Sequence, residues 1–74
     1  MMTYEFDSMK LGLAVRLKRK MIGLSVREVS ELTNLSTAAI TNIEGGDIAP
    51  SVATLSRLCT WLDPDPCEFW KKTR

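Results

Sequence analysis

Two short helical patterns joined by a four-residue turn restrict the fold of this chain more than any other feature. Ser25 and Glu28 form an S-x-x-E capping box, which predicts the start of one helix. The turn "TNLS" follows, and its Asn34 tolerates the left-handed conformation that a sharp turn requires. Ser36 can cap the second helix, and two consecutive glycines ending at Gly46 predict its end. The sequence therefore predicts two helices of seven or eight residues, closely connected.

Further caps and stops predict three more helices. Ser8 can cap a first helix that runs to about Ile22, and Ser51 can cap a fourth. Asp65, with Pro66 at the first helical position, predicts a last helix over 67–72. Nothing in the chain has the period-two pattern of a strand. We expect an all-α, compact five-helix fold, with residues 1–74 forming a single domain.

Apolar residues at helical spacing predict the core of this domain. We expect Leu17 and Met21 to lie at the edge of the apolar face of the first helix. The inward positions of the first four helices are Leu11, Val15, Ile22, Val29, Leu32, Ile40, Ile43, Val52, Leu55, Leu58, Cys59 and Leu62.

Composition argues against several classes of protein. The chain has 74 residues and no histidine, and neither Cys59 nor Cys67 lies beside an identifiable general base, so we expect no enzyme, metal or cofactor. Cys59 reads as a small core residue, although a disulfide with Cys67 stays possible. No apolar run is long enough to span a membrane, and acids stand where a signal peptide has basic residues, so we expect a cytoplasmic protein.

Charge is distributed unevenly along the chain. The net charge is only +1, so attraction to nucleic acid by total charge is weak. Four cations nevertheless fall within Arg16–Lys20, and three more close the chain. Such a run can be a solvated helix face as well as a contact to phosphate.

The paired short helices have the proportions of a helix-turn-helix. A turn of this length sets two helices roughly at right angles and leaves the N-terminal half of the second one exposed. A helix about 10–12 Å wide fits the major groove of B-DNA, which is about 12 Å wide.

Several motifs, in this order and spacing, resemble one known family. Arg19 precedes "GLS" at Gly23, "Ile-x-x-Ile-Glu-x-Gly" spans 40–46, and "P-S-V-x-x-L-x-x-L" begins at Pro50. Over 11–62 the chain resembles the lambda-repressor-like, Cro-type (XRE-family) helix-turn-helix domain of phage and bacterial regulators. The resemblance implies a sequence-specific regulator of transcription that binds double-stranded DNA, in the form of a small phage- or bacterial-type repressor.

The resemblance also implies roles for individual residues. Arg19 and Glu44 correspond to an ion pair between the first helix and the recognition helix, which would turn the lone acid of that helix inward. The alternative is an exposed glutamate at a helix end. Four residues fall where the family contacts bases or nearby phosphates: Thr37, Ala38, Thr41 and Asn42.

These four side chains suit A·T pairs without any positive charge. Asn can bind adenine N6 and N7, while Ala and the Thr methyl group can pack on the thymine methyl. The alternative is a face of small residues that packs against another helix.

Contacts to the DNA backbone must come from other positions. The sequence differs from the family pattern at Val26, where Gln is usual, at Thr33, where an apolar residue is usual, and at Asp47, where a cation is usual. We therefore expect few phosphate contacts, about three or four per monomer, and weak binding by one copy. The candidates are Arg16, Lys20, Ser25, Val26, Arg27, Ser36, Gly46 and Ser51.

Weak single copies favour a homodimer on DNA, with half-sites about 34 Å apart. Trp61, Phe69 and Trp70 could form its interface or could close the core. A protein-binding module on the same fold, such as an antitoxin or antirepressor-like partner, is the alternative function.

Overall fold

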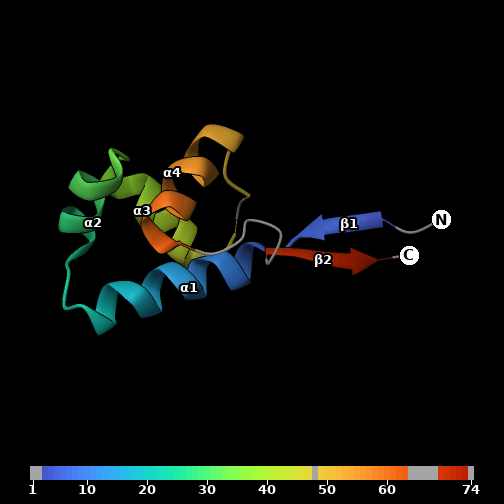
Figure 1. Ribbon diagram of the computed structural model, residues 1–74, viewed down its shortest axis with the longest axis horizontal. Helices are drawn as coiled ribbons and strands as arrows, with labels where there is room; N and C mark the ends of the chain where they lie inside the picture. The colour runs from blue at the N-terminus through green and yellow to red at the C-terminus, as the bar shows by residue number, and fades with distance from the viewer. Residues whose placement is uncertain (1–2, 48, 64–68, 74) are drawn as a thin grey trace.

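Helices form the body of the protein, and two strands extend from one end of it (Figure 1). The computed structural model describes residues 3–47, 49–63 and 69–73. Within these residues there are four helices and two strands. In chain order they are β1 (Thr3–Phe6), α1 (Ser8–Met21), α2 (Val26–Thr33), α3 (Thr37–Gly45), α4 (Val52–Leu62) and β2 (Trp70–Thr73).

The predicted caps of the three inner helices are confirmed. The side chains of Ser25, Ser36 and Ser51 each accept a hydrogen bond from the backbone three residues on, and Ser25 shares the complete capping box with Glu28. Gly46 ends α3 with φ of 74°. Each of these signals lies within one turn of the helix end that it sets, which explains why sequence alone locates them.

The predicted cap of the first helix is wrong by one residue. Asp7 is the N-cap of α1, and its carboxylate accepts a hydrogen bond from Lys10 N at 3.0 Å. Ser8 is the first helical residue. A carboxylate at this position satisfies a free N–H group and also suits the positive end of the helix dipole.

The core joins all four helices to the C-terminal segment. The buried apolar side chains are Leu11, Val15, Val29, Ile40, Ile43, Leu58 and Phe69, and Leu55, Cys59 and Leu62 pack against them while partly exposed. Three predicted core residues are instead exposed: Ile22, Leu32 and Val52. Ile22 lies beyond the last residue of α1, and Val52 is the first residue of α4, so neither helix carries its side chain over the core.

Gly12 allows α1 and α3 to approach closely. A Cβ atom at this residue would lie 2.3 Å from the carbonyl oxygen of Ile43 and 3.1 Å from that of Glu44. A real Cβ atom essentially never approaches a backbone atom as closely as 2.3 Å. Because residue 12 is glycine, α1 and α3 can pack at this short distance.

The prediction of a fifth helix is wrong over the described residues of the C-terminal segment. Residues 70–73 form β2, which pairs antiparallel with β1 so that Phe6 lies opposite Trp70. The rings of these two residues meet edge to face, with centroids 5.1 Å apart. Phe69 is buried in the core, and its carbonyl accepts a hydrogen bond from Asp7 N. The expected cap and first helical residues, 65–67, lie outside the described residues.

The strand pair also changes the expected fold class. The helical body is as predicted, but the C-terminal helix is absent from 70–73 and a two-stranded ribbon takes its place. The pairing joins residues at opposite ends of the chain, and no local pattern reports such a contact.

Lys18 links α1 to α4. Its Nζ donates a hydrogen bond to the backbone carbonyl of Trp61 and lies 5.0 Å from the centroid of the Trp61 ring. Trp61 is partly buried against the core, so one of the three aromatic residues considered for a dimer interface is engaged within the monomer.

Candidate nucleic-acid interface

The turn between α2 and α3 is fixed by its backbone conformation and by contacts from α2 and α4. Asn34 has the left-handed conformation predicted for it, with φ of 57°. Ser30 holds the turn on the α2 side, since its hydroxyl donates to Leu35 O while its carbonyl accepts from Leu35 N. Arg57 on α4 donates from Nη1 to the carbonyl of Asn34 at 3.0 Å. The turn that sets the angle between α2 and α3 is therefore held by contacts from α2 and from α4.

Thr33 explains how a polar residue fits where an apolar one is usual. It is buried, and its hydroxyl donates to Val29 O at 2.8 Å, one helical turn back. The methyl group is then left to fill the apolar site. The departure from the family pattern does not leave an unsatisfied polar group in the core.

The outer face of α3 is exposed and uncharged. Thr37, Ala38, Thr41 and Asn42 all lie exposed, whereas Ile40 and Ile43 on the opposite side are buried. The structure thus brings the four predicted base-reading residues together on one accessible face. Such a face can offer one amide pair for hydrogen bonds and several methyl groups for apolar contact.

The charged residue of α3 points away from this face. Arg19 Nε lies 2.7 Å from Glu44 Oε2 and Arg19 Nη2 lies 2.9 Å from Glu44 Oε1, so the pair is joined by two parallel hydrogen bonds. Arg19 Nη1 also donates to Leu24 O at 3.1 Å. The hydrogen bonds that Arg19 donates to the Glu44 carboxylate raise the pKa of Arg19 above its usual value. This pair fixes the C-terminal half of α3 against α1.

The predicted backbone contacts form two groups in space. Ser25, Val26 and Arg27 surround the start of α2, and Ser36 lies at the start of α3. Both helix starts present backbone N–H groups and a positive dipole end, which suits phosphate oxygens. Val26 packs partly against the core, so it can offer only its backbone there. Arg27 is exposed and lies 3.6 Å from Glu31.

The second group lies around the end of α3. Arg16 and Gly46 line a groove of about 580 Å³ between α1 and the α3 terminus, together with Met9, Leu13 and Glu44. Ser51 caps α4, so its hydroxyl is engaged. Lys20 is exposed in the last turn of α1. The structure does not bring Lys20 into either cluster.

Two supporting residues could not be found from sequence patterns. Arg57 stands on the polar side of α4, and Lys18 stands in the basic run of α1; both resemble ordinary solvated cations. Their carbonyl partners are 23 and 43 residues away along the chain, so only the folded structure reveals them.

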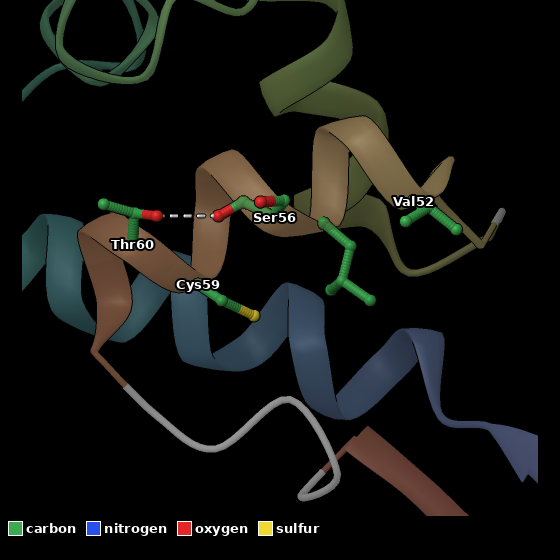
Figure 2. Close-up of a pocket in the computed structure, with 5 residues that line it drawn as sticks. Val52, Ser56, Cys59 and Thr60 are labelled. Carbon is green, nitrogen blue, oxygen red and sulfur yellow. Dashed lines mark hydrogen bonds between the residues drawn. The ribbon is translucent and has the colours of Figure 1, made fainter.

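An apolar groove of about 420 Å³ runs along α4 (Figure 2). It is lined by Val52, Leu55, Ser56, Cys59 and Thr60, and the Thr60 hydroxyl donates to Ser56 O at 2.9 Å. Cys59 is partly buried here, as its small size predicts, and Cys67 lies outside the described residues. No cluster of metal-binding side chains occurs in the described part of the chain.

Comparison with known proteins identifies the class. A family model for the helix-turn-helix matches residues 15–63, and the chain belongs to this family, in its XRE branch. It is a DNA-binding transcriptional regulator.

Among solved structures, the chain is similar to the restriction-modification controller protein C.AhdI from Aeromonas hydrophila. The two are 30% identical, with a TM-score of 0.69, and the match covers 85% of this chain and 96% of that one. A search of curated proteins found no significant match. Across the described residues, no helix combines the length and the apolarity needed to cross a bilayer.

Proposed function

We propose that this regulator binds a specific double-stranded DNA site as a homodimer, with α3 of each copy in the major groove, and that it acts as a repressor. The observation that carries the proposal is the exposed face of Thr37, Ala38, Thr41 and Asn42 on a helix whose single acid is turned inward. A carboxylate on the outer face would be repelled by phosphates. Its pairing with Arg19 removes that obstacle.

Base contacts on this face favour A·T pairs. The Asn42 amide can donate to adenine N7 and accept from N6, and the methyl groups of Thr41 and Ala38 can pack on thymine. Each good bidentate contact contributes about 1–3 kcal/mol of discrimination against the wrong base. Asn42 is therefore the residue whose loss should change the preferred sequence most.

Affinity for the phosphates comes from few groups in this proposal. The starts of α2 and α3 supply N–H groups, and Arg27 and Arg16 supply exposed cations. A chain with a net charge of +1 gains little from general attraction to DNA. Two copies bound to half-sites about 34 Å apart would bind DNA more tightly than one copy does.

The regulated genes are suggested by the structural neighbour. C.AhdI is a restriction-modification controller protein, and it matches this chain over nearly its whole length. We propose that this chain controls genes of the same kind. Genes for a restriction enzyme and its methyltransferase beside the coding sequence would support this assignment, whereas a small toxin gene there would favour the protein-binding alternative.

The test is selection of bound duplexes from a random DNA library at low salt. The wild-type chain should enrich a motif with two-fold symmetry and A·T pairs within each half-site. Asn42→Ala should lose the preference at one or two base pairs per half-site. Ser56→Ala, a small change in the α4 groove, is the control and should select the wild-type motif.

The result can also oppose the proposal. Enrichment of no motif, or binding that depends on salt but not on sequence, would exclude sequence-specific binding through α3. A motif unchanged by Asn42→Ala would move base readout away from this residue. An enriched motif without symmetry would exclude the homodimer on DNA.

A further inference from the structure

The outer side of α1 carries an exposed apolar stripe that contains none of the residues predicted to contact DNA. We name Met9, Leu13, Leu17 and Met21 the α1 stripe. They recur every fourth residue, which places them along one side of the helix over about 18 Å. Their exposed fractions are 76%, 56%, 51% and 84%. Single exposed apolar residues are common, but four in line on one helix mark an interaction surface.

A groove runs beside this stripe. It has a volume of about 470 Å³ and lies between α1 and the segments that end α4 and begin β2. Its apolar lining comes from Ala14, Leu17, Met21, Ile22, Leu62 and Phe69. The α1 stripe and this groove together form a surface on which an amphipathic helix of another molecule can pack its apolar face.

The charges around the stripe define the partner. Residues 8–21 contain five cations and no acid. Arg19 and Lys18 are engaged with Glu44 and Trp61. Lys10 precedes Leu13 by three residues, and Arg16 and Lys20 follow Leu13 and Leu17 by three, so cations flank the stripe on both sides.

We propose that the α1 stripe docks an amphipathic helix of a partner protein whose apolar face is flanked by carboxylates. Apolar contact would supply the affinity, and the two cation rows would select acidic partners over basic ones. A second copy of this chain fits poorly, because a symmetric contact would bring two sets of α1 cations together. A flat bilayer fits less well than a helix, because the surface is concave beside the stripe.

The C-terminal half of the stripe lies away from α3, whereas Met9 and Leu13 line the groove at the end of α3. Gly12 on α1 meets the backbone of α3, and Leu17 and Met21 lie about 140° and about 180° round the helix from Gly12. A helix docked on the stripe would leave Thr41 and Asn42 accessible. The inference does not depend on how α3 reads bases.

The test uses a synthetic peptide of about 16 residues, with leucines at helical spacing flanked by glutamates. Binding is followed by fluorescence anisotropy of the labelled peptide. Leu17→Glu should weaken binding by about tenfold or more, since it removes apolar contact and adds a like charge. Leu32→Glu, the same change at an exposed leucine of α2, is the matched control and should bind as the wild type does.

Charge selection has its own variant. Lys10→Glu should weaken binding of the glutamate peptide and strengthen binding of a peptide with lysines at the same positions. Both effects should decrease at high salt. A scrambled peptide of the same composition should not bind. Each variant is checked by thermal unfolding and by DNA binding, which should match the wild type for Leu17→Glu.

Four outcomes would overturn the inference. The first is that the scrambled peptide binds as tightly as the designed one, and the second is that Leu17→Glu binds the peptide as the wild type does. The third is that the protein binds anionic phosphatidylglycerol vesicles in the absence of peptide and that Leu17→Glu abolishes this binding. The fourth is self-association in sedimentation equilibrium that Leu17→Glu abolishes, which would assign the stripe to a second copy. Loss of DNA binding in the wild type would refute the proposed function and leave the peptide result to stand alone.

Discussion

The guanidinium of Arg19 and the carboxylate of Glu44 face each other in a two-bond ion pair that joins α1 to the end of α3. Their side chains are 15% and 10% exposed, so the pair is largely removed from water. It fixes α3 at the end opposite to the turn. Between them, the ion pair and the Arg57 contact to Asn34 hold both ends of α3 in place.

Removal of one partner of this pair should destabilise the protein strongly. Glu44→Gln leaves the Arg19 charge largely buried without its counter-charge, so we expect a loss of about 3 kcal/mol in the free energy of unfolding. Urea denaturation measures it. Glu31→Gln, in the exposed Arg27–Glu31 pair at 3.6 Å, is the matched control and should cost less than about 0.5 kcal/mol. The double change Arg19→Met with Glu44→Leu should cost less than Glu44→Gln; a larger cost would contradict this account.

The close approach at Gly12 predicts that even one methyl group is too large there. Gly12→Ala should destabilise the fold by about 1–3 kcal/mol and weaken DNA binding, because α1 and α3 must move apart. Gly45→Ala is the contrast, since its nearest neighbour would be the Asp47 side chain at an ordinary 3.5 Å. It should be neutral or stabilise α3 by up to about 1 kcal/mol. Equal thermal unfolding of both variants would refute the role of Gly12.

The left-handed Asn34 predicts an unusual order of substitutions in the turn. Asn34→Gly should leave stability nearly unchanged, because glycine adopts positive φ freely. Asn34→Ala should cost about 1 kcal/mol, although alanine is the better helix former elsewhere. Chemical denaturation of the two variants decides the order. An alanine variant as stable as the glycine variant would mean that the turn can relax out of this conformation.

Glu28 gives the stability of α2 a dependence on acid. Hydrogen bonds from the backbone and hydroxyl of Ser25 lower the pKa of Glu28 below its usual value of 4.5. The stabilisation is therefore fully present above pH 4.5 and is lost as the pH falls through the lowered pKa of the folded state. The melting temperature followed by circular dichroism should fall in this acid range. Glu28→Gln should flatten that fall, whereas Glu31→Gln should retain it; identical profiles for all three proteins would disprove the assignment.

What could be predicted from sequence follows the range of the interactions. Ser25, Ser36 and Asn34 act within one turn of their own position, and their structural roles were predicted correctly. The helix-turn-helix class also followed from local spacing. Helical periodicity was less reliable at Leu32 and Val52, since it gives the spacing of a face and not the position of the core relative to the ends of the helix.

The C-terminal segment shows the limit more clearly. Its Asp-Pro start signal predicted a helix, but Trp70 instead pairs with Phe6, a residue near the other end of the chain. The sequence left Phe69 between a dimer interface and closure of the core, and the structure places it in the core. The roles proposed for Thr37, Ala38, Thr41 and Asn42 remain predictions, although the structure exposes all four on one face.

The pairing of β1 with β2 also has a consequence for the order of folding. Helices α2 and α3 join residues that are close in the chain, so their contacts close short loops and can form within microseconds. The ribbon joins Phe6 to Trp70 and must close nearly the whole chain, which costs more entropy. We therefore expect the helical body to form first and the ribbon to pair last. In the native state the same ribbon should open first, so its amides should exchange hydrogen faster than those of α3.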